Sequence, residues 1–145
     1  FVAPDPAAVL YPAMFRAVHG KVPPTSWVTL SFAGYAHRLT RTSAREVELE
    51  VVDGRMLESV FEQLLRSSDV PVPLGHRVKV NGAWVEVTSL DGGLPNRLRI
   101  TFDDAPESNV LTFIRWEGER AMPFTLPALG ESVVLPKATG LLSTR

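Results

Sequence analysis

The sequence predicts a β-rich α+β domain, a small antiparallel barrel or sandwich of about eight short strands with one amphipathic helix. Two observations support this fold class. The 145 residues include 12 prolines and 10 glycines, and so many chain-breaking residues suit short elements joined by turns better than a helical bundle. Several segments also alternate apolar and polar residues, which is the period of a strand with one buried face.

The amino-acid composition indicates a globular domain and disfavours several kinds of partner and site. Hydrophobic residues make up 45% of the chain and charged residues 21%, so a core can form without metals or disulfides. The 15 basic and 16 acidic residues give a net charge of −1, which disfavours nucleic acid as a partner because its phosphates select a cationic surface. Cysteine is absent, which excludes disulfides, thiolate nucleophiles and thiolate metal sites. We expect no cofactor.

The first segment, residues 1–24, is apolar and carries few charges. Asp5 followed by Pro6 is typical of a helix start, Pro12 restricts the helix to a short or kinked one, and Gly20 is a natural end. Two interpretations stay open. The segment is either a short helix docked on the domain or a juxtamembrane segment that lies at an interface beside a membrane span. No uninterrupted apolar run approaches the length of about 18 residues that suggests a span.

Strand patterns begin after this segment. Residues 27–33 alternate with period two, an extended stretch follows over 35–40, and residues 46–52 alternate again. The last of these segments places three carboxylates on one side, which must face water. These carboxylates belong to Glu46, Glu48 and Glu50.

Residues 56–66 carry the clear amphipathic helix pattern of the chain. Apolar residues recur at i, i+3, i+4, i+7 and i+8, and polar residues fill the opposite side. Burial of such a stripe stabilises a fold by about 1.5–3 kcal/mol per side chain, so we expect this helix to cover a sheet or fill a barrel. The stripe consists of Leu57, Val60, Phe61, Leu64 and Leu65.

A β-hairpin is the strongest local prediction. Asn81 and Gly82 stand between two alternating segments, and this dipeptide favours a type I′ turn because both residues tolerate positive φ. Closure by two residues pairs Lys79 with Trp84 on the outer side of the hairpin, with Arg77 one step further along the same side. The register therefore predicts a partly exposed Trp84.

Four further strands are expected beyond the hairpin. The first alternates and carries Arg97 and Arg99 on its outer side, the second is apolar on both sides as in a central strand, and the third contains Pro123, which suits an edge strand. The four segments are residues 97–102, 110–116, 120–126 and 131–135. The β-rich domain is therefore expected over residues 25–136, with a frayed tail over 137–145.

Several blocks of turns and strands carry a family resemblance. They read ELEVVDGRMLESVFEQLLRS, PLGHRVKVNGAWVEV, LPNRLRITFD, LTFIRWEG and FTLPALGESVVLP. Together they resemble the C-terminal soluble domain of a group of uncharacterised bacterial multi-pass inner-membrane proteins. The resemblance implies a location in the bacterial envelope beside a bilayer, and it carries over no catalytic residue.

Few residues have the spacing that metal or catalytic sites need. The three histidines lie far apart in the sequence, without the short spacing that places two imidazoles on one metal. They are His19, His37 and His76. The acidic loop with Asp103, Asp104 and Glu107 is a weak calcium candidate, because its oxygens are close in sequence but lack the spacing of a helix–loop–helix site.

Basic residues on the outer sheet side form the candidate binding site. Such a surface could hold an anion, a lipid headgroup or a partner's carboxylates. The interpretation that we favour for the arginines is ordinary cross-strand pairing with the carboxylates of residues 46–50. The candidate set comprises Arg77, Lys79, Trp84, Arg97 and Arg99.

The leading hypothesis is a non-catalytic, membrane-proximal interaction or structural domain of a bacterial envelope protein. Its partner would be another envelope protein or the rest of a membrane protein. One alternative is a small β-barrel that binds a lipid or another small molecule, which requires an open apolar pocket of about 300 Å³ or more. A second alternative is a hydrolase with a nonstandard site, which requires a histidine within hydrogen-bond reach of a serine or aspartate in a cleft.

Overall fold

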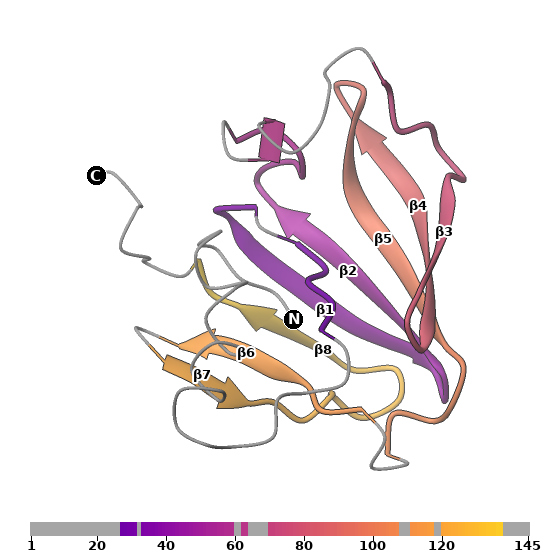
Figure 1. The fold of residues 1–145 in the computed structure, drawn as a ribbon. Helices are drawn as coiled ribbons and strands as arrows, with labels where there is room; N and C mark the ends of the chain where they lie inside the picture. Colours follow the sequence, from indigo (N-terminus) through magenta and orange to yellow (C-terminus); the bar gives the residue numbers. More distant parts are fainter. Residues whose placement is uncertain are drawn as a thin grey trace.

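The computed structural model describes residues 27–31, 33–59, 62–63, 70–107, 111–117 and 120–137. Within them, eight strands form two antiparallel sheets (Figure 1). The larger sheet has the strand order β3-β4-β5-β2-β1-β8, and β6 pairs with β7 in the smaller one. The strands are β1 (Ala36–Ser43), β2 (Glu46–Val52), β3 (Arg77–Val80), β4 (Ala83–Asp91), β5 (Leu94–Phe102), β6 (Ile114–Glu117), β7 (Arg120–Pro123) and β8 (Ser132–Leu135).

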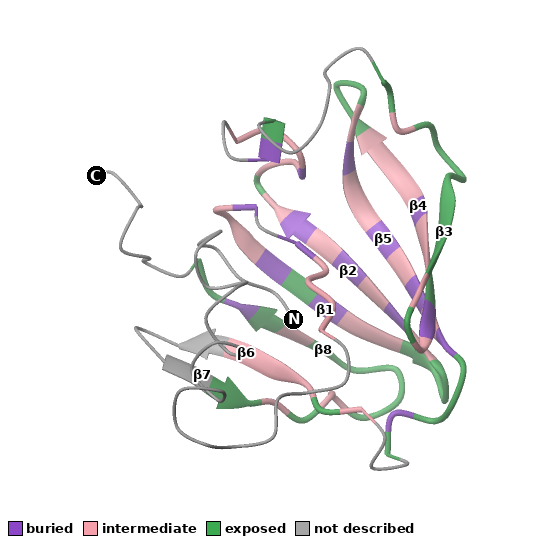
Figure 2. Cartoon of the chain, in the orientation of Figure 1, coloured by how far each residue is buried: buried purple, intermediate pink, exposed green. Residues whose placement is uncertain are grey.

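The larger sheet buries one of its faces. Buried and less buried residues alternate along β2 and β5 (Figure 2), as the sequence predicts for strands with one solvated side. Leu49 of β2 and Ile100 of β5 are fully buried at the centre of this face. The alternation confirms the predicted inward direction of Leu98, Ile100 and Phe102.

Loop segments, including those that flank the second sheet, supply the other side of the core. Partly buried hydrophobic residues before β1, after β2 and around β6 and β7 pack against the buried cluster. The Phe113 ring meets Phe102 edge to face, with 5.5 Å between the ring centroids. Phe124 joins the same layer through a 2.9 Å hydrogen bond from its backbone N–H to the carbonyl of Phe113. The core is thus a sheet covered by irregular chain.

The predicted hairpin is confirmed in its register, with Lys79 opposite Trp84 and Val80 opposite Ala83. The turn type differs from the prediction. Gly82 has φ of 81°, whereas Asn81 is not among the described residues with positive φ. One left-handed residue at the second central position is the pattern of a type II turn and not of type I′.

The predicted helix over residues 56–66 is not seen. Leu57 has φ of 63°, a left-handed conformation that a right-handed helix cannot contain. Glu62 and Gln63 have helical geometry, and Ser59 and Glu62 bond each other in a capping box, while four residues of the predicted apolar stripe lie outside the described part. Those four are Val60, Phe61, Leu64 and Leu65.

Other predictions about the architecture need correction. The sheet of described strands is open, with β3 and β8 at its edges, so the barrel prediction is wrong. In place of the strand predicted over residues 27–33, the described residues 27–31 and 33 contain a single bridge, at Ser31. Of the central strand predicted over 110–116, the structure shows β6 from Ile114 onward, and β6 belongs to a two-stranded sheet. No helix of the described residues has the length and apolar character to cross a membrane. The predicted leader over 1–24 lies outside the described residues.

Candidate functional site

A ladder of opposite charges covers the outer face of the larger sheet. Glu50 of β2 accepts hydrogen bonds from Arg38 of β1 at 2.7 Å and from Arg97 of β5 at 2.9 Å. Arg99 of β5 lies 3.5 Å from the Glu48 carboxylate. This confirms the favoured interpretation of cross-strand pairing. The hydrogen bond from Arg97 lowers the pKa of Glu50, and the hydrogen bond from Arg38 lowers it to a smaller extent.

Three of the five candidate binding residues meet on the β3–β4 hairpin. The Arg77 guanidinium lies 4.4 Å from the centroid of the Trp84 ring, and the Lys79 ammonium lies 5.2 Å from it. Trp84 is partly exposed, as the register predicts. Lys79 also forms an ion pair with Asp103. We call Arg77, Lys79 and Trp84 the hairpin cluster; Arg97 and Arg99 are separate from it because they pair with the carboxylates of β2.

The hairpin cluster follows from the strand ladder. Side chains of directly opposed residues stand closest at the pairs that do not exchange backbone hydrogen bonds. Val87 donates its N–H to the carbonyl of His76 at 2.9 Å, so these two residues form a hydrogen-bonded pair. Hydrogen-bonded pairs then recur at every second residue of β3, counted from His76. Arg77 and Lys79 therefore occupy the non-bonded positions, which bring their cations to the Trp84 ring.

The acidic loop does not assemble the calcium candidate. Asp103 pairs with Lys79, and Glu107 pairs with Arg41 at 2.5 Å. The two carboxylates are thus directed to cations on different strands, and the hydrogen bond from Arg41 lowers the pKa of Glu107. Among the residues placed by the structure, no group of three or more histidine and acidic side chains is arranged to hold a metal ion.

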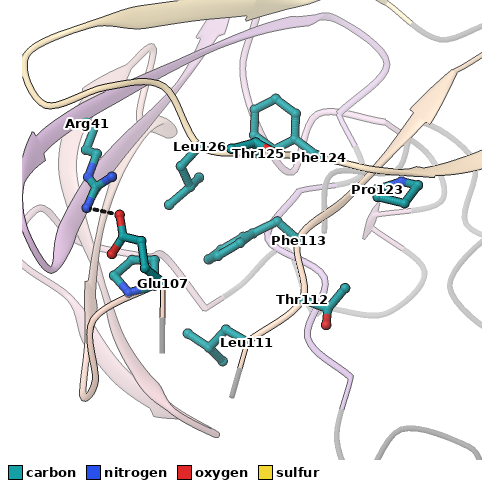
Figure 3. A pocket seen from close by; sticks show the side chains of 10 residues that line it. Arg41, Glu107, Leu111, Thr112, Phe113, Pro123, Phe124, Thr125 and Leu126 are labelled. Atoms are coloured by element: carbon teal, nitrogen blue, oxygen red, sulfur yellow. Dashed lines mark ion pairs between the residues drawn. The ribbon is translucent and has the colours of Figure 1, made fainter. Parts of the chain in front are cut away.

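An apolar hollow of about 250 Å³ lies beside the second sheet (Figure 3). Leu111, Phe113 and Leu126 project toward its centre, and the Arg41–Glu107 ion pair stands at one side. Its volume is below the range of about 300–1,000 Å³ that is usual for small-molecule pockets. The hollow therefore falls short of what the ligand-binding alternative requires.

A second, polar hollow of about 620 Å³ was not anticipated from the sequence. The Tyr35 hydroxyl donates to Glu58 at 2.9 Å, and Arg55 pairs with the same carboxylate. The hydrogen bond to Glu58 raises the pKa of Tyr35, while Arg55 and, to a lesser extent, Tyr35 lower the pKa of Glu58. Asp53 lines the hollow with φ of 57°. The Asp-Gly pair at residues 53–54 is the one sequence signal of this turn, and nothing local points to its partners.

His37 lies on β1 and faces the core of the larger sheet. Its side chain is buried, and its Nε2 lies 2.9 Å from the Ser31 hydroxyl. Burial lowers the pKa of His37 to about 4, partly opposed by a hydrogen bond with the Tyr35 backbone. The hydrolase alternative requires such a pair in a cleft, but His37 and Ser31 line neither hollow. His76 is exposed in a turn, and His19 lies outside the described residues.

Comparison of the chain with protein-family models, with curated proteins and with solved structures found no match.

Proposed function

We propose that the chain is a non-catalytic protein-interaction domain that binds an acidic partner through the hairpin cluster. The observation that carries this proposal is the stacking of two cations on one partly exposed tryptophan at the edge of the sheet. Tryptophan and arginine are among the residue types most enriched in binding hot spots.

The stacked arrangement prepares Arg77 above all for a partner, because Lys79 is already paired with Asp103. Free arginine and lysine side chains lose up to about 2 kcal/mol of conformational entropy when a partner immobilises them. Contact with the Trp84 ring restrains Arg77 and Lys79 before binding, so less of this cost remains. Arg77 forms no ion pair within the described residues, whereas Arg97 and Arg99 are already paired. A partner carboxylate is the natural ligand for such a guanidinium.

The resemblance to membrane-anchored bacterial proteins supports the choice of partner class. A domain held beside a bilayer in the envelope would meet other envelope proteins or further segments of its own protein. Recognition by exposed cations would be steered by charge and weakened by salt. Both properties suit a reversible contact.

The test uses a fluorescently labelled, glutamate-rich peptide as the probe and anisotropy as the readout. Wild type should bind the peptide saturably at low ionic strength and more weakly as salt is added. The double variant Arg77→Glu/Lys79→Glu should lose about tenfold or more in affinity, which corresponds to about 1.4 kcal/mol. Trp84→Ala should lose affinity in the same direction.

Lys137→Glu is the control for charge reversal, because it makes the same change of charge as each single substitution of the double variant, at an exposed position beyond β8, at the opposite edge of the sheet. It should bind the peptide within about twofold of wild type. Absence of saturable binding, or equal loss in the control and in the double variant, would contradict the proposal.

A further inference from the structure

We infer that the free edge of β3 binds an extended segment of the partner as an added strand, and that this segment alternates acidic and apolar residues. This inference rests on the proposed function, because it names the mode and the sequence pattern by which an acidic partner is recognised. β-Strand addition combines backbone hydrogen bonds for affinity with alternate side chains for specificity.

The backbone of β3 leaves bonding groups on its outer edge. In an antiparallel pair, successive residues direct their N–H and C=O groups alternately toward the neighbour strand and away from it. The bond from the Val87 N–H to the His76 carbonyl sets this alternation, so Val78 and Val80 bond to β4. The N–H and C=O groups of Arg77 and Lys79 therefore point away from the sheet, where a further strand would pair.

The edge is also accessible. β3 is an edge strand of the larger sheet, as Figure 1 shows. Its residues Arg77, Val78 and Lys79 are exposed, and the chain that leads into it is largely exposed too (Figure 2). Val78 keeps 42% of its surface exposed although it belongs to the core side of the sheet. Among the described strands, none pairs with this edge.

The two faces of β3 dictate the pattern of the added strand. Its side chains would alternate between the outer face and the core face. On the outer face they would stand beside Arg77 and Lys79. Lys79 is paired with Asp103, so the Arg77 guanidinium, which forms no ion pair within the described residues, is the group that favours an acidic neighbour there. On the core face they would stand beside Val78, where an apolar side chain would cover exposed surface. Alternating acidic and apolar residues satisfy both faces.

Charge complementarity selects β3 over the opposite edge. β8 has the sequence SVVL and carries no charged side chain. An acidic segment would gain no ion pair from it. The two edges therefore differ in the partner that they favour, and the acidic segment belongs at β3.

The decisive experiment follows amide hydrogen exchange in the full chain with a short synthetic peptide of alternating glutamate and valine. The amides of Arg77 and Lys79 should exchange quickly in the free protein and at least about tenfold more slowly with saturating peptide. The amides of Val78 and Val80, already bonded to β4, should change little. A peptide of the same composition with its glutamates and valines in two separate blocks should bind more weakly.

The outcomes separate the two proposals. If the alternating peptide binds and the amides of Arg77 and Lys79 stay unprotected, strand addition is wrong and side-chain recognition through the hairpin cluster stands. If neither peptide binds, both proposals are wrong. Equal affinity for the two peptides would overturn the inferred pattern.

A pair of variants tests the backbone contribution separately. Lys79→Ala removes the charge and keeps the N–H, whereas Lys79→Pro also removes the outward N–H that the added strand would use. Proline is tolerated at an edge position whose N–H faces solvent, and protected amides of Val78 and Val80 would show that the hairpin is intact. Lys79→Pro should bind the alternating peptide about fivefold more weakly than Lys79→Ala, as expected for one lost hydrogen bond. Equal affinities would contradict strand addition.

Discussion

The His37 imidazole lies on the core face of β1, where it is kept neutral. Its pKa of about 4 lies below the ordinary value of 6.5 because burial disfavours the charged form. An unfolded chain regains the ordinary pKa, so between these two values the unfolded state binds the proton more tightly. The contribution of neutral His37 to stability is therefore full above pH 6.5 and is lost as pH falls toward 4.

We predict an acid-dependent loss of stability that this residue causes. Lowering the pH from about 7 to about 4.5 should reduce the free energy of unfolding by about 2 kcal/mol through His37 alone. Denaturant unfolding of wild type and of His37→Gln at both pH values measures this, since carboxylate titration is common to the two proteins. The same pH dependence in both proteins would show that His37 is not buried neutral.

Gly54 is required by the close approach of an aromatic ring. A Cβ at this position would lie 2.5 Å from carbons of the Tyr35 ring, whereas a Cβ at Gly34 would meet nothing within 4 Å. Gly54→Ala should lower the free energy of unfolding by about 1–3 kcal/mol, because the ring must move. Gly34→Ala should change it by less than about 1 kcal/mol. Thermal or denaturant unfolding compares the two, and equal effects would contradict the packing of Tyr35 on this turn.

Among the strands, Glu50 of β2 links its two neighbours, because Arg38 of β1 and Arg97 of β5 both donate to its carboxylate. We predict that Glu50→Gln lowers the free energy of unfolding by about 1 kcal/mol, a modest value because the pair is partly screened by water. Glu131→Gln, at an exposed position before β8, should have a smaller effect. Denaturant unfolding at low and high salt provides the measurement, and the difference between the variants should shrink in high salt.

The elements that the sequence predicted correctly are those that depend only on residues close together in the chain. Alternation alone defines β2 and the direction of Leu98 and Ile100, and the Asn81–Gly82 turn fixes the register of the hairpin. The helix prediction failed because periodicity says nothing about the left-handed φ of Leu57. In the structure the Leu57 N–H donates to the Glu62 carboxylate at 2.9 Å, a contact outside the hydrogen-bond pattern of a helix.

At the scale of the molecule, the described core centres on one sheet. Leu49 is fully buried on β2, which pairs with β1 on one side and β5 on the other. Leu49→Ala should lower the free energy of unfolding by about 2–5 kcal/mol. The matched variant Leu129→Ala, at a leucine that is 64% exposed, should cost less than about 1 kcal/mol. Amide exchange should show the loss for Leu49→Ala in every strand from β4 to β1, and a loss confined to β2 would mean that the sheet does not unfold as a unit.

The candidate sites follow the same rule as the elements: a site built from residues close in the sequence was predictable, and a site built from distant segments was not. The hairpin cluster was predictable because Arg77, Lys79 and Trp84 come from one local turn and its register. The polar hollow was not, since Tyr35, Glu58 and Asp91 come from separate parts of the chain. Closure of the sheet into a barrel also depends on long-range geometry, and alternation is the same in open and closed sheets.

The position of β8 in the sheet affects how the chain folds during synthesis. Thr40 of β1 and Ser132 of β8 share a 2.8 Å hydrogen bond although 92 residues separate them. During synthesis, the edge of β1 that pairs with β8 therefore stays unpaired until β8, the last described strand in the sequence, has left the ribosome. A nascent chain in this interval offers β1 to any other extended polypeptide, so binding by a chaperone or a pause in translation would matter most before β8 emerges.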